Sequence, residues 1–116
     1  MAYRYFSLDE FKCRETGENK IDPTFVECLD HLRDVVGFPF IISSGYRSPS
    51  HSVEKNKPGG PGMHSKGIAA DIKVSNGAQR FMLVRAAIDM GFKGIGVEKD
   101  FVHVDLRDTD PVLWTY

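Results

Sequence analysis

Two separate segments of this sequence carry side chains that are typical metal ligands, and their spacing is the strongest constraint on the fold. His64 and Asp71 stand seven positions apart, and His103 follows 32 residues after Asp71. Two imidazoles and one carboxylate are the ligand set that zinc uses when one coordination position stays open for water. Because each segment has the pattern of a β-strand or of the residues leading into one, we expect them to be neighbouring strands of one sheet.

The remaining patterns predict that helices pack on this sheet. Asp22 and Pro23 favour a helix start, and apolar residues recur every three or four positions from there until Gly37. A second helix is expected to begin at residue 75 or 76 and to end near residue 91. The expected strands span residues 38–43, 67–74, 92–97 and 101–106. At 116 residues, the chain is expected to form a single α+β domain (1–116) with a small antiparallel sheet and flanking helices.

Two segments lack a regular pattern. Residues 50–62 are polar and rich in glycine and proline, so we expect no helix or strand there but a mobile surface loop beside the first ligand. Residues 108–116 form a tail that carries the only tryptophan, Trp114, which is expected to anchor it.

The composition excludes several classes of function. The formal net charge is −1, so no basic field exists to hold nucleic acid or an anionic membrane surface. No apolar run approaches the roughly 20 residues that span a bilayer. Residues 1–10 contain early acidic side chains and lack the apolar core of a secretory signal, so we expect synthesis in the cytoplasm without a signal peptide. We expect a monomer.

Zinc held by two histidines and one carboxylate makes its bound water acidic, but hydrolysis also needs a proton acceptor. Asp100 is the favoured general base, because it stands three residues before His103 at the mouth of the strand. Asp105 is its main rival, on the same face as His103 and about 7 Å along the strand. Asp105 could instead orient a ligand or Arg107. Glu98 is the third candidate.

Residues 43–48, with the sequence SSGYRS, form a turn-rich loop at the end of the first expected strand. The guanidinium of Arg47 can make bidentate contact with a substrate carboxylate or with a developing oxyanion. We therefore expect Arg47 to take part in catalysis and in substrate binding. Ser44 and Tyr46, on the same loop, are expected to contact the substrate with it.

Three of these segments together resemble a known family. Residues 43–48 (SSGYRS), 64–71 (HSKGIAAD) and 101–105 (FVHVD) are similar to the zinc D-Ala-D-Ala carboxypeptidase-like peptidases. The similarity extends from about Phe6 to Arg107. The family includes bacterial cell-wall carboxypeptidases and bacteriophage endolysins that cut peptidoglycan stem peptides.

The resemblance implies an α+β fold of the hedgehog/D,D-peptidase type and a zinc ion bound by His64, Asp71 and His103. It also implies that Arg47 contacts the substrate or the oxyanion. Some members place an acidic base three residues before the last histidine, which is the position of Asp100 here.

The activity implied by the resemblance is hydrolysis of a peptide bond in a peptidoglycan stem peptide by metal-activated water. An endolysin-type L-Ala-D-Glu endopeptidase and a D-Ala-D-Ala carboxypeptidase both stay open. Such a protein acts at the bacterial cell wall after release, or stays in the host cytoplasm if it is virally encoded. The alternative is a non-catalytic, zinc-bearing module that binds the cell wall or serves in virion assembly.

Overall fold

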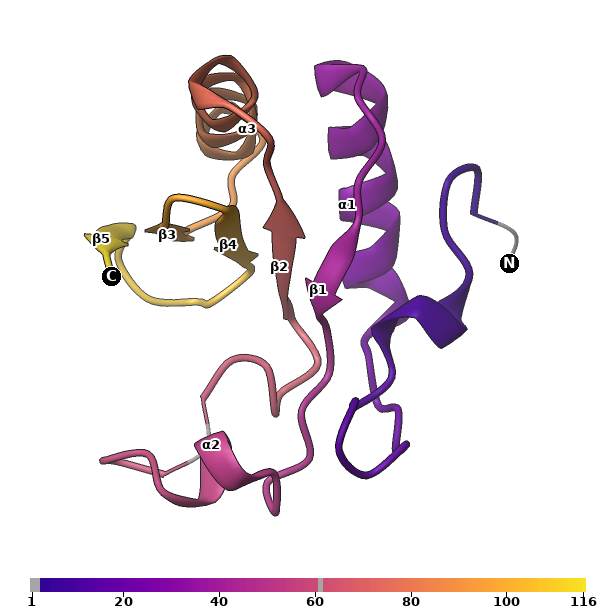
Figure 1. The fold of residues 1–116 in the computed structure, drawn as a ribbon, viewed down its shortest axis with the longest axis vertical. Helices are drawn as coiled ribbons and strands as arrows, with labels where there is room; N and C mark the ends of the chain where they lie inside the picture. The colour runs from indigo at the N-terminus through magenta and orange to yellow at the C-terminus, as the bar shows by residue number, and fades with distance from the viewer. Residues whose placement is uncertain (1–2, 61) are drawn as a thin grey trace.

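A computed structural model describes residues 3–60 and 62–116, which form an open five-stranded sheet with helices packed on it (Figure 1). Met1 and Ala2 of the N-terminal stretch, and Pro61 of the expected loop, lie outside the described residues. The elements, in chain order, are η1 (Leu8–Phe11), α1 (Pro23–Val36), β1 (Ile42–Ser44), α2 (Ser52–Lys55), β2 (Ala69–Lys73), α3 (Gly77–Asp89), β3 (Gly94–Val97), β4 (Phe101–Asp105) and β5 (Val112–Thr115). The predicted α+β class is confirmed.

Helix α1 begins and ends where the sequence predicts. The carboxylate of Asp22 accepts a hydrogen bond from the Thr24 amide at 2.8 Å, and Pro23 occupies the first helical position. Gly37 ends the helix in the left-handed conformation, with φ of 82°. The buried face of α1 consists of Phe25, Val26, Leu29, Leu32 and Val36. In the part of the chain that the structure describes, every helix is too short or too polar to cross a membrane.

The strand order of the sheet is β1-β2-β4-β3-β5, and β2 and β4 pair antiparallel at its centre. Their register sets Asp71 directly opposite His103. Val102 and Val104 are fully buried in the core shared with the helices. Since side chains alternate along a strand, His103 projects from the opposite face of the sheet. The core therefore takes one face of β4, and the other face carries Phe101, His103 and Asp105.

The first strand is shorter than predicted and begins later. The prediction placed it at residues 38–43, whereas β1 comprises Ile42–Ser44. Pro39 has no amide hydrogen to give to a neighbouring strand, which disfavours pairing at that end. A shift of register between Ile42 and Ser44 also interrupts the pairing with β2.

The prediction that residues 50–62 contain no helix is wrong, because Ser52–Lys55 forms the short helix α2. The side chain of His51 accepts a hydrogen bond from the Val53 amide at 3.0 Å and caps this helix. Glu54 is fully buried, and its carboxylate accepts a hydrogen bond from the Gly62 amide at 2.8 Å. Polar contacts rather than an apolar face hold this segment, so its sequence shows no helical repeat of apolar residues from which α2 could be predicted.

The tail forms a fifth strand, which the sequence analysis did not predict. β5 pairs parallel with β3, so the sheet is mostly but not wholly antiparallel. Trp114 lies opposite Gly96, where an added Cβ would come within 2.7 Å of the indole. The glycine makes room for the ring across β3, and Trp114 anchors the tail as expected.

Candidate metal centre

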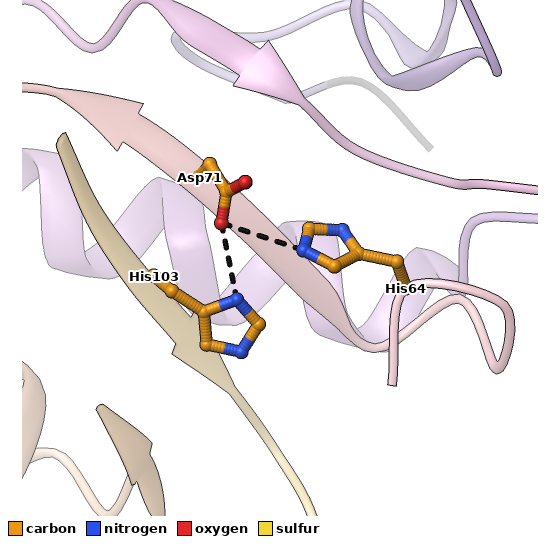
Figure 2. Close-up of side chains that lie close together, drawn as sticks. All are labelled: His64, Asp71 and His103. Atoms are coloured by element: carbon orange, nitrogen blue, oxygen red, sulfur yellow. Dashed lines mark hydrogen bonds and ion pairs between the residues drawn. The ribbon is translucent and has the colours of Figure 1, made fainter. Parts of the chain in front are cut away.

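The three predicted ligands converge from two strands and the turn before one of them (Figure 2). His103 Nδ1 lies 3.0 Å from Asp71 Oδ1, and His64 Nε2 lies 3.4 Å from the same oxygen. All three side chains are buried. The two histidines thus point at one carboxylate oxygen from different directions, as they would around a shared cation.

The orientation of His64 is set by the loop that follows β1. His64 Nδ1 lies 2.7 Å from the carbonyl oxygen of Gly45. Because a carbonyl can only accept, Nδ1 donates the hydrogen, and Nε2 keeps its lone pair for a metal. The backbone amide of Arg47 in turn donates to the His64 carbonyl at 3.2 Å. The SSGYRS loop and the first ligand therefore hold each other in place.

The orientation of His103 is set by a buried carboxylate. His103 Nε2 lies 2.7 Å from Asp105 Oδ2, which leaves Nδ1 facing Asp71. Arg107 donates from Nε to Asp105 Oδ1 at 2.9 Å and from a terminal nitrogen to Oδ2 at 2.7 Å. A Cβ at Gly94 would collide with this carboxylate, so Gly94 provides the space that it occupies. A carboxylate behind a ligating histidine fixes the ring and raises its basicity.

The pKa values suit a cation site. Burial raises the pKa of Asp71, but hydrogen bonds from His103 and His64 outweigh burial and hold that pKa below its usual value. Burial also raises the pKa of Asp105, but hydrogen bonds from Arg107 and His103 outweigh burial and lower this pKa. Burial lowers the pKa of His103, but the bonds to Asp105 and Asp71 outweigh it and raise this pKa. Both carboxylates are therefore ionised at neutral pH, and a metal would compete with a proton for His103.

The donor set fits zinc. His103 Nδ1 and His64 Nε2 lie 3.0 and 3.4 Å from Asp71 Oδ1, close to the roughly 3.3–3.6 Å that separates ligand atoms around one tetrahedral ion with bonds of about 2.0–2.2 Å. Two imidazole nitrogens disfavour calcium and magnesium, which prefer oxygen ligands. Three protein ligands leave one coordination position for water or substrate.

The candidate ligands line a cavity of about 570 Å³. Besides the ligands, its main charged and aromatic lining residues are Arg47, Lys57, Phe101, Arg107, Trp114 and Tyr116. The open side of the metal centre therefore faces a space large enough for part of a peptide.

Arg47 lies beside the candidate ligands. Its Nε donates to Ser44 Oγ at 3.0 Å, and its two terminal nitrogens lie 3.1 Å from Glu54 Oε2 and 3.4 Å from Asp71 Oδ2. The guanidinium is thus held on three sides. Ser44 positions Arg47 in the structure, a role that differs from the substrate contact expected for it.

Three other predicted site residues do not face this cavity. Tyr46 is 2% exposed and packs in the hydrophobic core, so its side chain is turned away from the substrate space. Asp100 is exposed and lines a neighbouring cavity, which among the described residues shares only Phe101 with the first. The Glu98 carboxylate accepts a hydrogen bond from the Asp100 amide at 2.8 Å within the same turn. The structure thus brings together the ligands, Arg47 and Asp105, but leaves these three residues outside.

Glu54 and Tyr116 were not predicted from the sequence, Trp114 was given no place in the site, and Arg107 was named only as a group that Asp105 could orient. Glu54 lies in the segment predicted to be an irregular loop, where one acidic residue among several polar ones gives no signal. The two-residue spacing of Asp105 and Arg107 was the hint that the sequence offered for this pair. Trp114 and Tyr116 reach the cavity through β5, which no sequence pattern indicated.

Two comparisons bear on this site. The sequence model of the family described as Peptidase M15 matches residues 4–105, a span that contains all three candidate ligands. No curated protein matches the chain.

Proposed function

The chain belongs to the peptidase M15 family, whose members are zinc-dependent, and on that premise we propose that it hydrolyses a peptide bond in peptidoglycan stem peptides. The observation that carries this proposal is the convergence of His64, Asp71 and His103 on one point at the wall of an open cavity. The segments that resemble the zinc D-Ala-D-Ala carboxypeptidase-like peptidases, 64–71 and 101–105, contain these three residues. The domain is proposed to be a single peptidase domain that acts as a monomer.

Zinc, when bound, makes a water molecule acidic near neutral pH and polarises a carbonyl group. The chain's own residues supply the rest. Asp71 contributes the negative ligand, and the two histidines bind as neutral imidazoles. We assign to Arg47 the donation of hydrogen bonds to a carbonyl oxygen as negative charge develops on it, and the position of its guanidinium beside Asp71 supports this role.

The roles of the acids follow from their surroundings. Asp105 is fully buried, and both its oxygens are engaged by His103 and Arg107, so we assign it to positioning His103. Asp100 is the base implied by the family resemblance, but its carboxylate would have to leave the neighbouring cavity to reach the water. Substitution of Asp100 is therefore the informative test of that role.

The substrate proposal rests on the family and on the character of the cavity. Peptidoglycan stem peptides carry free carboxylates, which suit a cavity lined by Arg47 and Lys57. The bond is proposed to be either L-Ala–D-Glu, as for an endolysin-type endopeptidase, or D-Ala–D-Ala, as for a carboxypeptidase. Action at the bacterial cell wall follows from either substrate.

Digestion of purified peptidoglycan by the zinc-loaded protein, followed by mass spectrometry of the released products, tests the proposal. A new amino terminus on glutamate identifies the endopeptidase, and free D-alanine identifies the carboxypeptidase. The variant His64→Ala, treated in the same way, is the control and should release neither. A zinc-loaded wild-type protein that releases no product would contradict the proposal and favour the non-catalytic binding module.

A further inference from the structure

One wall of the cavity comes from residues that lie beyond the family match. The match ends at residue 105, whereas Arg107, Trp114 and Tyr116 line the cavity from the following segment, 106–116. Arg107 directly follows β4, whereas Trp114 and Tyr116 are brought to the site by β5, which adds to the edge of the sheet beside β3. The segment that follows the matched region therefore contributes one wall of the site.

The neighbouring strand β3 makes room for Trp114 through a glycine. Gly96 lies opposite Trp114, and an added Cβ there would come within 2.7–2.9 Å of three indole atoms. The indole centroid lies 5.1 Å from the ring of His103. The guanidinium carbon of Arg107 lies 5.1 Å from the centroid of the indole. The indole is thus held between a candidate ligand and the arginine that supports this ligand through Asp105.

Tyr116 continues the wall outward from Trp114. Its ring centroid lies 6.4 Å from that of Trp114 and 5.2 Å from that of Phe101 on β4. Tyr116 is 66% exposed as a residue and lines the cavity, so its side chain can meet a ligand there. Phe101, Trp114 and Tyr116, called here the aromatic wall, form a continuous surface beside His103.

The two sides of the cavity differ in chemistry. Arg47 and Lys57 belong to the segments around α2, and Lys57 Nζ lies 3.5 Å from the buried carboxylate of Glu54. The aromatic wall comes from β4 and the tail instead. Flat aromatic faces bind aliphatic C–H surface and gain little from a carboxylate. A substrate that fits both sides therefore carries its charge toward Lys57 and an aliphatic surface toward Tyr116.

We propose that segment 106–116 is a substrate-binding element whose Trp114 and Tyr116 complete, with Phe101 of β4, an aromatic wall that binds aliphatic C–H surface of the peptidoglycan fragment beside the scissile bond. This inference rests on the proposed function for the identity of the ligand. The C–H surface comes from the alanine methyl groups of the stem peptide or from the ring face of the attached amino sugar. Both sources share the chemistry that the wall recognises.

The single tryptophan of the chain makes the test direct, because selective excitation of tryptophan reports on Trp114 alone. Zinc-loaded protein is mixed in a stopped-flow instrument with a disaccharide–tetrapeptide, with the synthetic tetrapeptide, or with the disaccharide. We expect a saturable change of Trp114 emission that precedes turnover. A response to the tetrapeptide alone assigns the wall to the alanine methyl groups, and a response to the disaccharide alone assigns it to the sugar.

Two substitutions on β5 and its end complete the test. Tyr116→Ala removes an exposed ring of the wall and should weaken binding by about fivefold, with unchanged zinc content and circular dichroism. Leu113→Ala is the matched control, because Leu113 is also exposed and lies outside the cavity lining. Equal affinities of these two variants would overturn the inference.

The outcomes separate this inference from the proposed function. A change of Trp114 emission without hydrolysis would leave the aromatic wall as a binding site and refute the peptidase activity. Hydrolysis with no change of emission, and with Tyr116→Ala as active as wild type, would refute the wall and leave the peptidase activity standing.

Discussion

His103 and Asp105 lie two residues apart on β4, and their side chains meet with Nε2 of the histidine 2.7 Å from Oδ2 of the aspartate. The contact fixes which nitrogen of His103 faces Asp71. The strand therefore supplies both a candidate ligand and the group that orients it. Arg107 holds the aspartate from the other side through two hydrogen bonds.

Asp105→Asn is expected to lower zinc affinity by about 10- to 100-fold, because the amide removes the charge that supports His103. Competition with a chromogenic chelator measures the change. Asp108→Asn serves as the control, because Asp108 is exposed and lies just beyond the strand. An unchanged affinity for Asp105→Asn would show that His103 needs no such support.

Asp100→Asn is expected to keep both its zinc and most of its turnover, since Asp100 lines the neighbouring cavity. Steady-state kcat/KM on a stem-peptide substrate, with zinc content measured in parallel, checks this expectation. A loss of about 100-fold or more with zinc retained would instead identify Asp100 as the general base that the family resemblance implies.

Glu54→Gln is expected to lower kcat/KM by about tenfold while zinc content stays unchanged. The buried carboxylate of Glu54 holds the guanidinium of Arg47 at 3.1 Å, and loss of its charge frees Arg47 from the orientation in which it faces the ligands. Glu27→Gln on α1 is a control of the same chemistry. Equal activity of the two variants would contradict a positioning role for Glu54.

The stability that Glu54 contributes is expected to disappear in acid. Burial raises its pKa, but hydrogen bonds from the Gly62 amide and from Arg47 outweigh burial and hold the pKa below its usual value. A lowered pKa in the folded state stabilises the protein above the usual glutamate pKa of about 4.3, and this contribution is lost as the pH falls through the folded value.

Urea unfolding of wild type and of Glu54→Gln across this range isolates the effect from that of the other acids. The difference between their free energies of unfolding should stay constant from about pH 7 to about pH 5 and shrink below that. A difference that is the same in acid and at neutral pH would show that the charge of Glu54 does not stabilise the fold.

The candidate ligands and the central strands could be proposed from the sequence because both depend on local regularities. Strand alternation places Asp71 and His103 on one face once their strands pair, and the caps at Asp22 and Gly37 define α1 within the chain itself. Glu54 has no comparable signal. Its role arises from contacts with Arg47 and Gly62 that exist only after the loop has folded.

The aromatic wall was unpredictable for a related reason. Residues 112–115 are mostly exposed and too short to show a clear period, and their strand exists through pairing with β3. From the sequence alone, Gly96 is expected to weaken its strand, because glycine has no side chain to pack. In the fold, the absence of a side chain at Gly96 leaves room for the indole of Trp114. Tertiary contacts, rather than propensity, decide these positions.

The proposal that His64, Asp71 and His103 share one metal ion is tested most directly by a crystal structure of the zinc-loaded protein with anomalous data at the zinc edge. A single ion is expected within about 2.2 Å of His64 Nε2, a carboxylate oxygen of Asp71 and His103 Nδ1. Zinc bound at another site, or these three side chains without a common ion, would contradict the account.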